Sequence, residues 1–149
     1  MNLKHKKVLI TGANRGIGEA LVNEALRRGA KKVYAGTRTP LRHTDDRVTP
    51  LTLDVTSDAQ IERAAREIDA LDVLVNNAGI ALPDDLTELA PLEQQLAVNL
   101  FGSLKMSRAF LPLLKRSGGA IVNALSLAAI AHRCRSFLPT PSRRRRPLP

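Results

Sequence analysis

The chain has 149 residues and 44% of them are hydrophobic, which fits one globular domain with a substantial core. Its net charge of +9 does not indicate a nucleic-acid-binding face, because six arginines and no acidic residue follow Ala131. Subtracting these six charges leaves +3 for the rest of the chain, so the basic character belongs to one segment rich in proline and arginine.

The first predicted unit is a strand, a glycine-rich turn and a helix. Residues 7–10 form a short apolar run that is typical of a buried strand. Ile17, Leu21 and Ala25 follow at helical spacing and predict the buried face of a helix that ends at Gly29.

Further strands alternate with helices. Residues 32–35, 48–55 and 73–75 predict the second, third and fourth strands. Ser57 and Gln60 predict a capping box for the helix between the last two, whose apolar residues are Ile61, Ala65 and Ile68.

A long helix is predicted after Pro91, and Gly118 and Gly119 are expected to end it. Pro112 should bend its last turns. The face expected to be apolar comprises Leu92, Leu96, Leu100, Ser103, Ser107 and Leu114. Residues 120–125 then predict a fifth strand, with an exposed edge.

Strands that alternate with helices predict an α/β fold, a Rossmann-like doubly wound parallel sheet with a ligand at the carboxyl ends of its strands. The loop TGANRGIG lies directly between the first strand and helix. Its glycines, Gly12, Gly16 and Gly18, permit a tight turn and let a pyrophosphate approach the N-terminal N–H groups of the helix. The alternative is that the loop is only a tight turn.

Five motifs in order carry a family resemblance: TGANRGIG at 11–18, Asp54-Val55, NNAG at 76–79, Val98-Asn99 and IVNALS at 121–126. Together they resemble the short-chain dehydrogenase/reductase family, from about residue 6 to Ala131. The resemblance implies the strand order 3-2-1-4-5, a partial domain over residues 1–131, and a separate segment over 132–149.

The resemblance also implies a dinucleotide site. Asp54 would accept a hydrogen bond from the adenine amino group and the Val55 amide would meet a ring nitrogen, although Asp54 is also placed to cap the strand end. The NNAG segment has a structural alternative as well. The implied cofactor-binding residues are Gly12, Asn14, Arg15, Gly16, Ile17, Gly18, Arg38, Asp54, Val55, Asn76, Asn77, Ala78 and Gly79.

The sequence favours NADP over NAD as the cofactor. An NAD site places a carboxylate about 20 residues beyond the glycine loop, whereas this chain has Thr37 and Arg38 there and no acid until Asp45. Arg15 is a second cation inside the loop. Two guanidiniums bind a 2′-phosphate, which a carboxylate would repel.

The family's catalytic set is only half present. Ser126 matches the serine that polarises the substrate carbonyl, and Asn99 matches the asparagine that supports a proton-relaying water. A strand-end hydroxyl and a helix-kink amide are their structural alternatives. The family's tyrosine and the lysine four residues later are missing, because the one tyrosine is Tyr34 and no lysine follows Lys115.

The segment 132–149 departs from the family pattern where the tyrosine is expected, near Pro139 and Thr140. A shifted reading frame there permits Tyr-Ser-Val-Thr-Lys, so we hypothesise a frameshift near Ala131. A truncated isoform, a basic arm for nucleic acid and a solvated disordered tail are the alternatives.

The sequence therefore predicts an NADP-dependent oxidoreductase that acts on a small-molecule carbonyl or alcohol, truncated and impaired in this form. A non-catalytic NADP-binding protein or fragment is the alternative. The single Cys134 and the lack of an apolar run long enough for a signal or a membrane span predict a metal-free cytoplasmic protein. Nucleic acid and membrane are not expected partners, and the full-length family form is expected to be a homo-oligomer.

Overall fold

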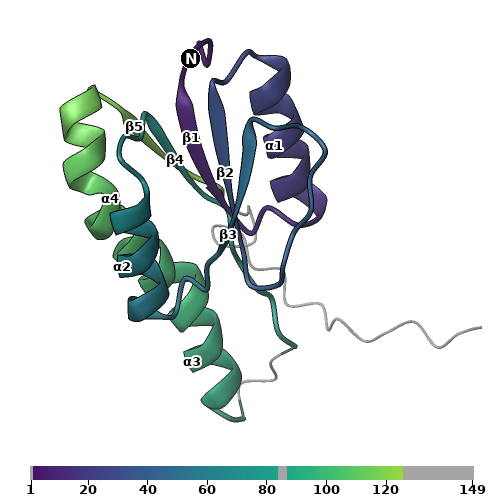
Figure 1. Ribbon diagram of the computed structural model, residues 1–149. Helices are drawn as coiled ribbons and strands as arrows, with labels where there is room; N and C mark the ends of the chain where they lie inside the picture. Colours follow the sequence, from purple (N-terminus) through teal and green to yellow (C-terminus); the bar gives the residue numbers. More distant parts are fainter. Residues whose placement is uncertain (1, 84–86, 126–149) are drawn as a thin grey trace, which may run out of the picture.

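The computed structural model describes residues 2–83 and 87–125 (Figure 1). They form a five-stranded parallel sheet in the order β3-β2-β1-β4-β5. Its strands are β1 (Lys7–Thr11), β2 (Lys32–Thr37), β3 (Val48–Thr52), β4 (Val73–Asn76) and β5 (Ala120–Asn123). This topology confirms the predicted Rossmann-like α/β fold and strand order. Ser126 and the segment 132–149 lie outside the described residues.

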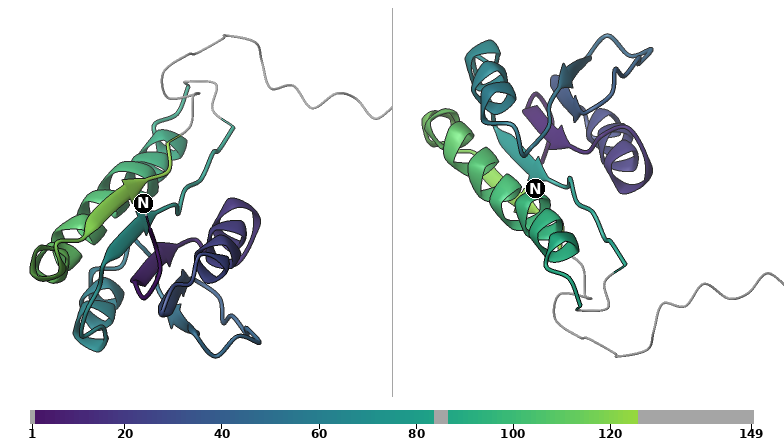
Figure 2. Two further views of the ribbon diagram at one scale, coloured as in Figure 1. Left: turned by 90° about the horizontal axis from the view of Figure 1, so that it is seen from above. Right: turned by 90° about the horizontal axis from the view of Figure 1, so that it is seen from below.

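Helices cover both faces of the sheet. Helix α1 (Gly16–Arg27) lies on one face, and α2 (Asp58–Glu67) and α4 (Ser103–Ser117) lie on the other (Figures 1 and 2). Helix α3 (Ala90–Leu96) and a π-helical segment, η1 (Ala97–Gly102), lead directly into α4. In the described part of the chain, no helix is both long and apolar enough to span a membrane.

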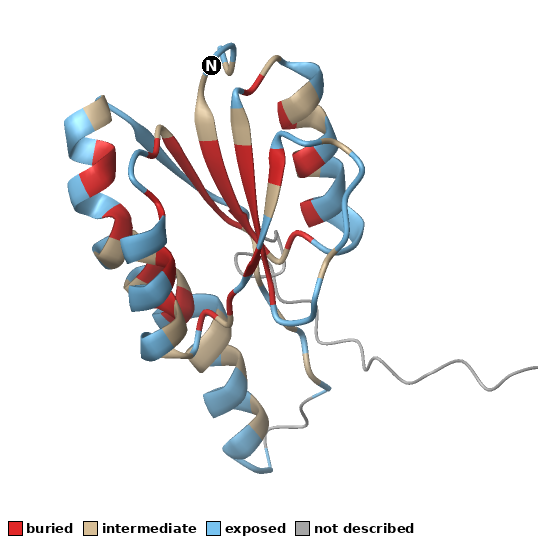
Figure 3. Cartoon of the chain, in the orientation of Figure 1, coloured by how far each residue is buried: buried red, intermediate tan, exposed pale blue. Residues whose placement is uncertain are grey.

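The core has two halves because successive strand residues point to opposite faces of the sheet. Val8 and Ile10 of β1 pack in a cluster with Val22 of α1. Leu9, which lies between them, packs in the other cluster with Met106 and Phe110 of α4. Figure 3 shows this buried layer in the central strands and on the inward faces of the helices.

The predicted buried faces of two helices were partly wrong. In α1 the buried residues are Gly18, Val22 and Ala25, whereas Ile17 is 70% exposed. In the long helical stretch, Leu92, Leu96 and Leu100 are exposed, and the buried residues of α4 are Met106, Phe110, Leu113 and Leu114. A π-helical turn contains more residues than an α-helical turn. The residues of α3 before η1 therefore do not lie on the same face of the helix as the buried residues of α4 after it.

The long helix ends as predicted. Gly118 has a left-handed backbone with φ +61°, which is the usual conformation of a glycine that ends a helix. The strand that follows, β5, is the outer strand of the described sheet next to β4, and all four of its residues are exposed. The exposed edge expected for the fifth strand is therefore present among the described residues.

Candidate dinucleotide-binding site

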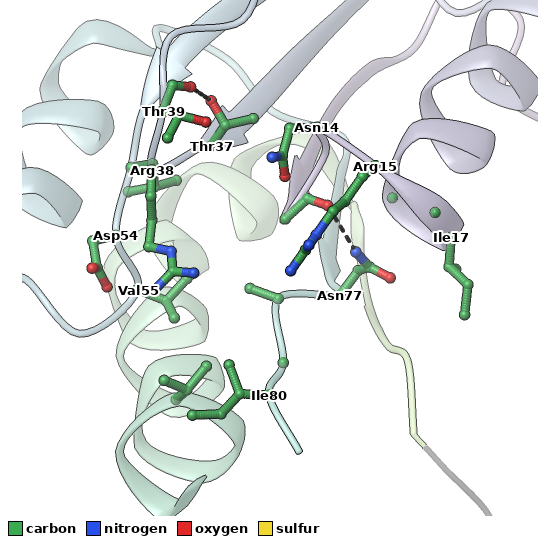
Figure 4. A pocket seen from close by; sticks show the side chains of 17 residues that line it. Asn14, Arg15, Ile17, Thr37, Arg38, Thr39, Asp54, Val55, Asn77 and Ile80 are labelled. Atoms are coloured by element: carbon green, nitrogen blue, oxygen red, sulfur yellow. Dashed lines mark hydrogen bonds between the residues drawn. The ribbon is translucent and has the colours of Figure 1, made fainter. Parts of the chain in front are cut away.

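A pocket of about 590 Å³ lies at the carboxyl ends of the parallel strands. Each of the first four strands contributes the residues that follow it, as expected for a ligand site in a doubly wound sheet. The lining comprises Gly12, Asn14, Arg15, Gly16, Ile17 and Gly18 after β1, Thr37, Arg38 and Thr39 at β2, Leu53, Asp54 and Val55 after β3, Asn77, Ala78, Gly79 and Ile80 after β4, and Val98 of η1 (Figure 4).

Two glycines of the loop after β1 have distinct roles. Both Gly12 and Gly16 have left-handed backbones, with φ +67° and +55°. A Cβ on Gly12 would come within 3.0 Å of the Ala78 Cα, so Gly12 lets the loop pack against the segment after β4. A Cβ on Gly16 would meet nothing within 4 Å. Gly16 thus leaves open space at the first turn of α1, where N–H groups have no helical acceptor.

Thr11 joins the glycine loop to the segment after β4. Its buried hydroxyl accepts hydrogen bonds from the backbone N–H groups of Asn77 and Ala78 at 3.0 and 2.9 Å, and donates to the Val75 carbonyl at 3.3 Å. The Asn77 side chain donates to the carbonyl oxygens of Thr11 and Gly12 at 2.9 and 3.3 Å. These bonds fix two walls of the pocket relative to each other.

Two arginines extend toward the pocket from opposite sides, Arg15 from the glycine loop and Arg38 from the end of β2 (Figure 4). Both are exposed. Within the described ranges, neither guanidinium forms a salt bridge or donates a hydrogen bond, unlike Arg27, Arg28 and Arg47. Two unpaired cations beside one pocket can bind an anionic group there.

Asp54 is the acidic residue of the pocket lining. Its Oδ1 accepts from the Thr56 N–H at 2.8 Å and from the Thr56 hydroxyl at 2.7 Å. Burial raises the pKa of Asp54, but these hydrogen bonds and the Arg38 charge together hold that pKa below its usual value. The carboxylate is therefore ionised at neutral pH, when it only accepts hydrogen bonds.

Asn76 is buried and belongs to a polar cluster outside the pocket lining. Its Nδ2 donates to Asn123 Oδ1 at 2.9 Å, to Ser107 Oγ at 3.1 Å and to the Ser103 carbonyl at 3.4 Å. Its buried Oδ1 has no hydrogen-bond donor among the described residues. Asn76 thus ties β4 to β5 and α4, which is the structural alternative for this part of the NNAG motif.

Asn99 lies in η1 and pairs with the chain after the NNAG motif. Its Nδ2 donates to the Ile80 carbonyl at 2.8 Å, and its Oδ1 accepts from the Ile80 N–H at 2.9 Å. A Cβ on Gly79 would lie 3.4 Å from the same Oδ1. Asn99 therefore holds the floor of the pocket in place. Ser126, the other predicted catalytic residue, lies outside the described residues.

The sequence matches the family model for short chain dehydrogenases over residues 6–136. The chain belongs to this family. Among its relatives, estradiol 17-beta-dehydrogenase 2 of Mus musculus is 35% identical over 139 residues, which is 82% of this chain and 36% of the relative. Short chain dehydrogenase pigC of Monascus ruber is 35% identical over 150 residues, which is 86% of this chain and 50% of the relative.

Solved structures of short chain dehydrogenases share the fold. One from Burkholderia cenocepacia, in complex with NADP, has a TM-score of 0.83 and 40% identity, and the match covers 88% of this chain and 58% of that one. An NADPH-bound carbonyl reductase from chicken fatty liver has a TM-score of 0.76 and 32% identity, over 85% and 61% of the two chains. The chain spans roughly a third to a half of the length of the curated relatives above.

The pocket brings together all the predicted cofactor-binding residues except Asn76. The sequence did not predict the supporting roles of Thr11, Thr56 and Gln60 at the pocket. Gln60 was expected to bond back to Ser57, but its Oε1 accepts from the Asp54 N–H at 2.8 Å. Only the other half of the capping box is present, with Ser57 Oγ accepting from the Gln60 N–H at 3.4 Å. The available signal was that Thr11 begins the glycine-loop motif and that Thr56 directly follows the Asp54-Val55 motif.

Proposed function

We propose that residues 1–131 form the NADP-binding part of a short-chain dehydrogenase/reductase. The observation that carries this proposal is the pair of exposed arginines beside the pocket, Arg15 and Arg38, without a carboxylate at the end of β2. A 2′-phosphate between two guanidiniums would gain charge-assisted hydrogen bonds, whereas NAD has only a neutral 2′-hydroxyl at this position. NADP-bound structures among the similar short chain dehydrogenases support the same choice of cofactor.

The other residues of the pocket fit the remaining parts of a dinucleotide. The open surface at Gly16 and the first turn of α1 suit the pyrophosphate. Asp54 presents a carboxylate for the adenine amino group. The N–H of the neighbouring Val55 donates to no described residue and is available for a ring nitrogen. All these residues line one pocket, which extends from the glycine loop to the end of β3.

For the whole protein we propose oxidation or reduction of a small-molecule alcohol or carbonyl. The bound nicotinamide would supply or accept the hydride. Asn99 would hold the pocket floor and support a proton-relaying water, and Ser126 would polarise the substrate oxygen. The residue that exchanges a proton with that oxygen in the family, a tyrosine paired with a lysine, has no counterpart in these 149 residues.

One observation favours a second function, NADP binding without catalysis. The only tyrosine, Tyr34, is 5% exposed and packs in the core between the sheet and helices α2 and α4. It is not part of the pocket lining. No tyrosine of this chain is therefore placed to exchange a proton with a substrate in the pocket, and we expect the 149-residue chain to bind NADPH without oxidising it.

The test is a titration of the purified chain with NADPH and NADH, followed by fluorescence. We expect tighter binding of NADPH, by about tenfold or more, and loss of that preference in Arg38→Asp, since the new carboxylate repels the 2′-phosphate. Arg63→Asp is the matched control, because Arg63 is exposed on α2 outside this pocket. Equal binding of both dinucleotides, or an unchanged preference in Arg38→Asp, would overturn the cofactor assignment.

A second assay separates the two functions. NADPH oxidation is followed at 340 nm with a panel of aldehydes and ketones. Binding without oxidation supports the non-catalytic alternative for this chain, whereas steady turnover would show that another residue replaces the tyrosine.

A further inference from the structure

The backbone of Asp54 is fixed by side chains and N–H groups of the residues that follow it. The Asp54 N–H donates to Gln60 Oε1 at 2.8 Å, and its carbonyl accepts from the Ser57 N–H at 3.0 Å. Both Ser57 and Gln60 lie at the start of α2, since Ser57 is the residue that caps this helix. Residues at the start of α2 therefore fix the backbone of Asp54, from which its side chain extends.

Thr56 fixes the carboxylate itself. Its N–H and its hydroxyl both donate to Oδ1 of Asp54, at 2.8 and 2.7 Å. A carboxylate oxygen has two lone pairs in its plane, so these two donors satisfy Oδ1. Within the described residues, no donor bonds to Oδ2. The two oxygens of one carboxylate thus differ, and Oδ2 is the acceptor left for a ligand.

The environment keeps this acceptor ionised and close to the pocket. Asp54 is half-buried and lines the pocket on the same side as Val55 and Arg38 (Figure 4). The hydrogen bonds from Thr56 keep its pKa low in spite of burial. Because the side chain is already ordered, little rotational freedom is lost when a donor binds to Oδ2.

We propose that Thr56 is a positioning residue that aims Oδ2 of Asp54 at the exocyclic amino group of adenine and so selects adenine dinucleotides over hypoxanthine dinucleotides. This inference rests on the proposed NADP-binding function. Hypoxanthine carries a carbonyl oxygen where adenine carries the amino group. An ionised carboxylate held in one orientation bonds to the amino group and repels the carbonyl oxygen.

The preference between the two bases separates this role from simple stabilisation of the turn. A residue that only stabilised the turn would change the affinity for both dinucleotides by the same factor. A residue that orients Oδ2 changes their ratio, because adenine presents an amino donor at the 6-position and hypoxanthine presents a carbonyl oxygen there. Thr56 is exposed, so its replacement by valine should not prevent folding.

The experiment measures dissociation constants of NADPH and of its hypoxanthine analogue for the full chain and three variants. We expect the wild-type chain to prefer NADPH by about tenfold or more. Thr56→Val keeps the backbone donor and loses the hydroxyl, and it should reduce this preference by about threefold or more. Thr56→Ser keeps the hydroxyl and should retain the preference. Thr52→Val, an exposed change on β3 outside the pocket, is the control.

The outcomes test the positioning role of Thr56 separately from the proposed NADP-binding function. If the wild-type chain binds neither dinucleotide, the proposed NADP-binding function fails and the inference fails with it. If NADPH binds but the ratio is unchanged in Thr56→Val, or is lost equally in Thr56→Ser, the positioning role alone is overturned. A ratio that falls in Thr56→Val and is retained in Thr56→Ser and Thr52→Val supports it.

Discussion

Replacement of Thr11 by valine tests how the two walls of the pocket are joined. The buried Thr11 hydroxyl accepts from two backbone N–H groups, those of Asn77 and Ala78. Valine has nearly the same shape, so no cavity forms, but both donors lose their acceptor. An unsatisfied buried donor costs about 1–3 kcal/mol, and both groups are only partly buried. We therefore expect the free energy of unfolding to fall by about 2–3 kcal/mol, out of a typical total of about 5–15 kcal/mol.

Equilibrium unfolding in urea measures this loss. With a slope of about 2 kcal/mol per M, the midpoint of Thr11→Val should fall by about 1 M. Thr52→Val makes the same chemical change at an exposed position of β3 and should leave the midpoint nearly unchanged. Thr11→Ser keeps the hydroxyl and should retain most of the stability. A loss below about 0.5 kcal/mol in Thr11→Val would refute the assignment of Thr11 as the connection between the two walls.

Three further predictions use backbone conformation and charge. Gly16→Ala and Gly118→Ala replace glycines with nearly the same left-handed φ, +55° and +61°, and open space at the Cβ position, so each should cost about 1 kcal/mol of stability. Only Gly16→Ala should weaken NADPH binding. If both variants had the same dissociation constant for NADPH, the assignment of the pyrophosphate to the surface at Gly16 would be contradicted. His5 has φ +63°, so His5→Gly should raise the free energy of unfolding by about 0.5 kcal/mol, and a lower urea midpoint would contradict this. Hydrogen bonds from arginine side chains lower the pKa of Glu24 from 4.5 to about 2 and that of Asp45 from 3.8 to about 2. Since both pKa values are lower in the folded chain, these groups stabilise it above pH 4.5 and this contribution is lost as the pH falls to about 2. Acid unfolding curves should show a smaller loss in 1 M salt, and no dependence on salt would contradict the assignment to these exposed pairs.

The sheet and the pocket at its edge were predictable because both follow from local pattern. Short apolar runs bounded by polar turns locate the strands, and their alternation with helices fixes parallel pairing. Polar and glycine residues directly after each strand then locate the pocket, as Gly16, Arg38 and Asp54 show. These residues lie far apart in the sequence, but parallel strands bring their carboxyl ends to one edge of the sheet.

Side-chain direction was harder to predict from the sequence. Asn76 and Asn77 are neighbours in one motif, yet Asn76 bonds to β5 and α4 while Asn77 bonds to the glycine loop. Adjacent residues of a strand end point to opposite sides, and the motif does not say which side faces the ligand. The sequence did not predict that Leu96 and Leu100 are exposed. Their exposure follows from the π-helical turn, which depends on tertiary packing and does not show in the helical period.

Tertiary contacts around η1 hold the π-helical turn in place. A Cβ on Gly102 would come within 2.7 Å of a Val55 methyl group, so the last residue of η1 lies against the loop after β3. Asn99 bonds to Ile80 from the same segment. Contacts with two separate loops hold this turn, and neither loop adjoins it in the sequence.

The most direct test of NADP binding in this pocket is a crystal structure of the purified chain with NADPH. We expect the pyrophosphate at Gly16 and the first turn of α1, the 2′-phosphate within hydrogen-bonding distance of Arg15 and Arg38, and the adenine amino group at Oδ2 of Asp54. A cofactor bound elsewhere, or a 2′-phosphate that contacts neither arginine, would contradict the proposal that this pocket binds NADP through Arg15 and Arg38.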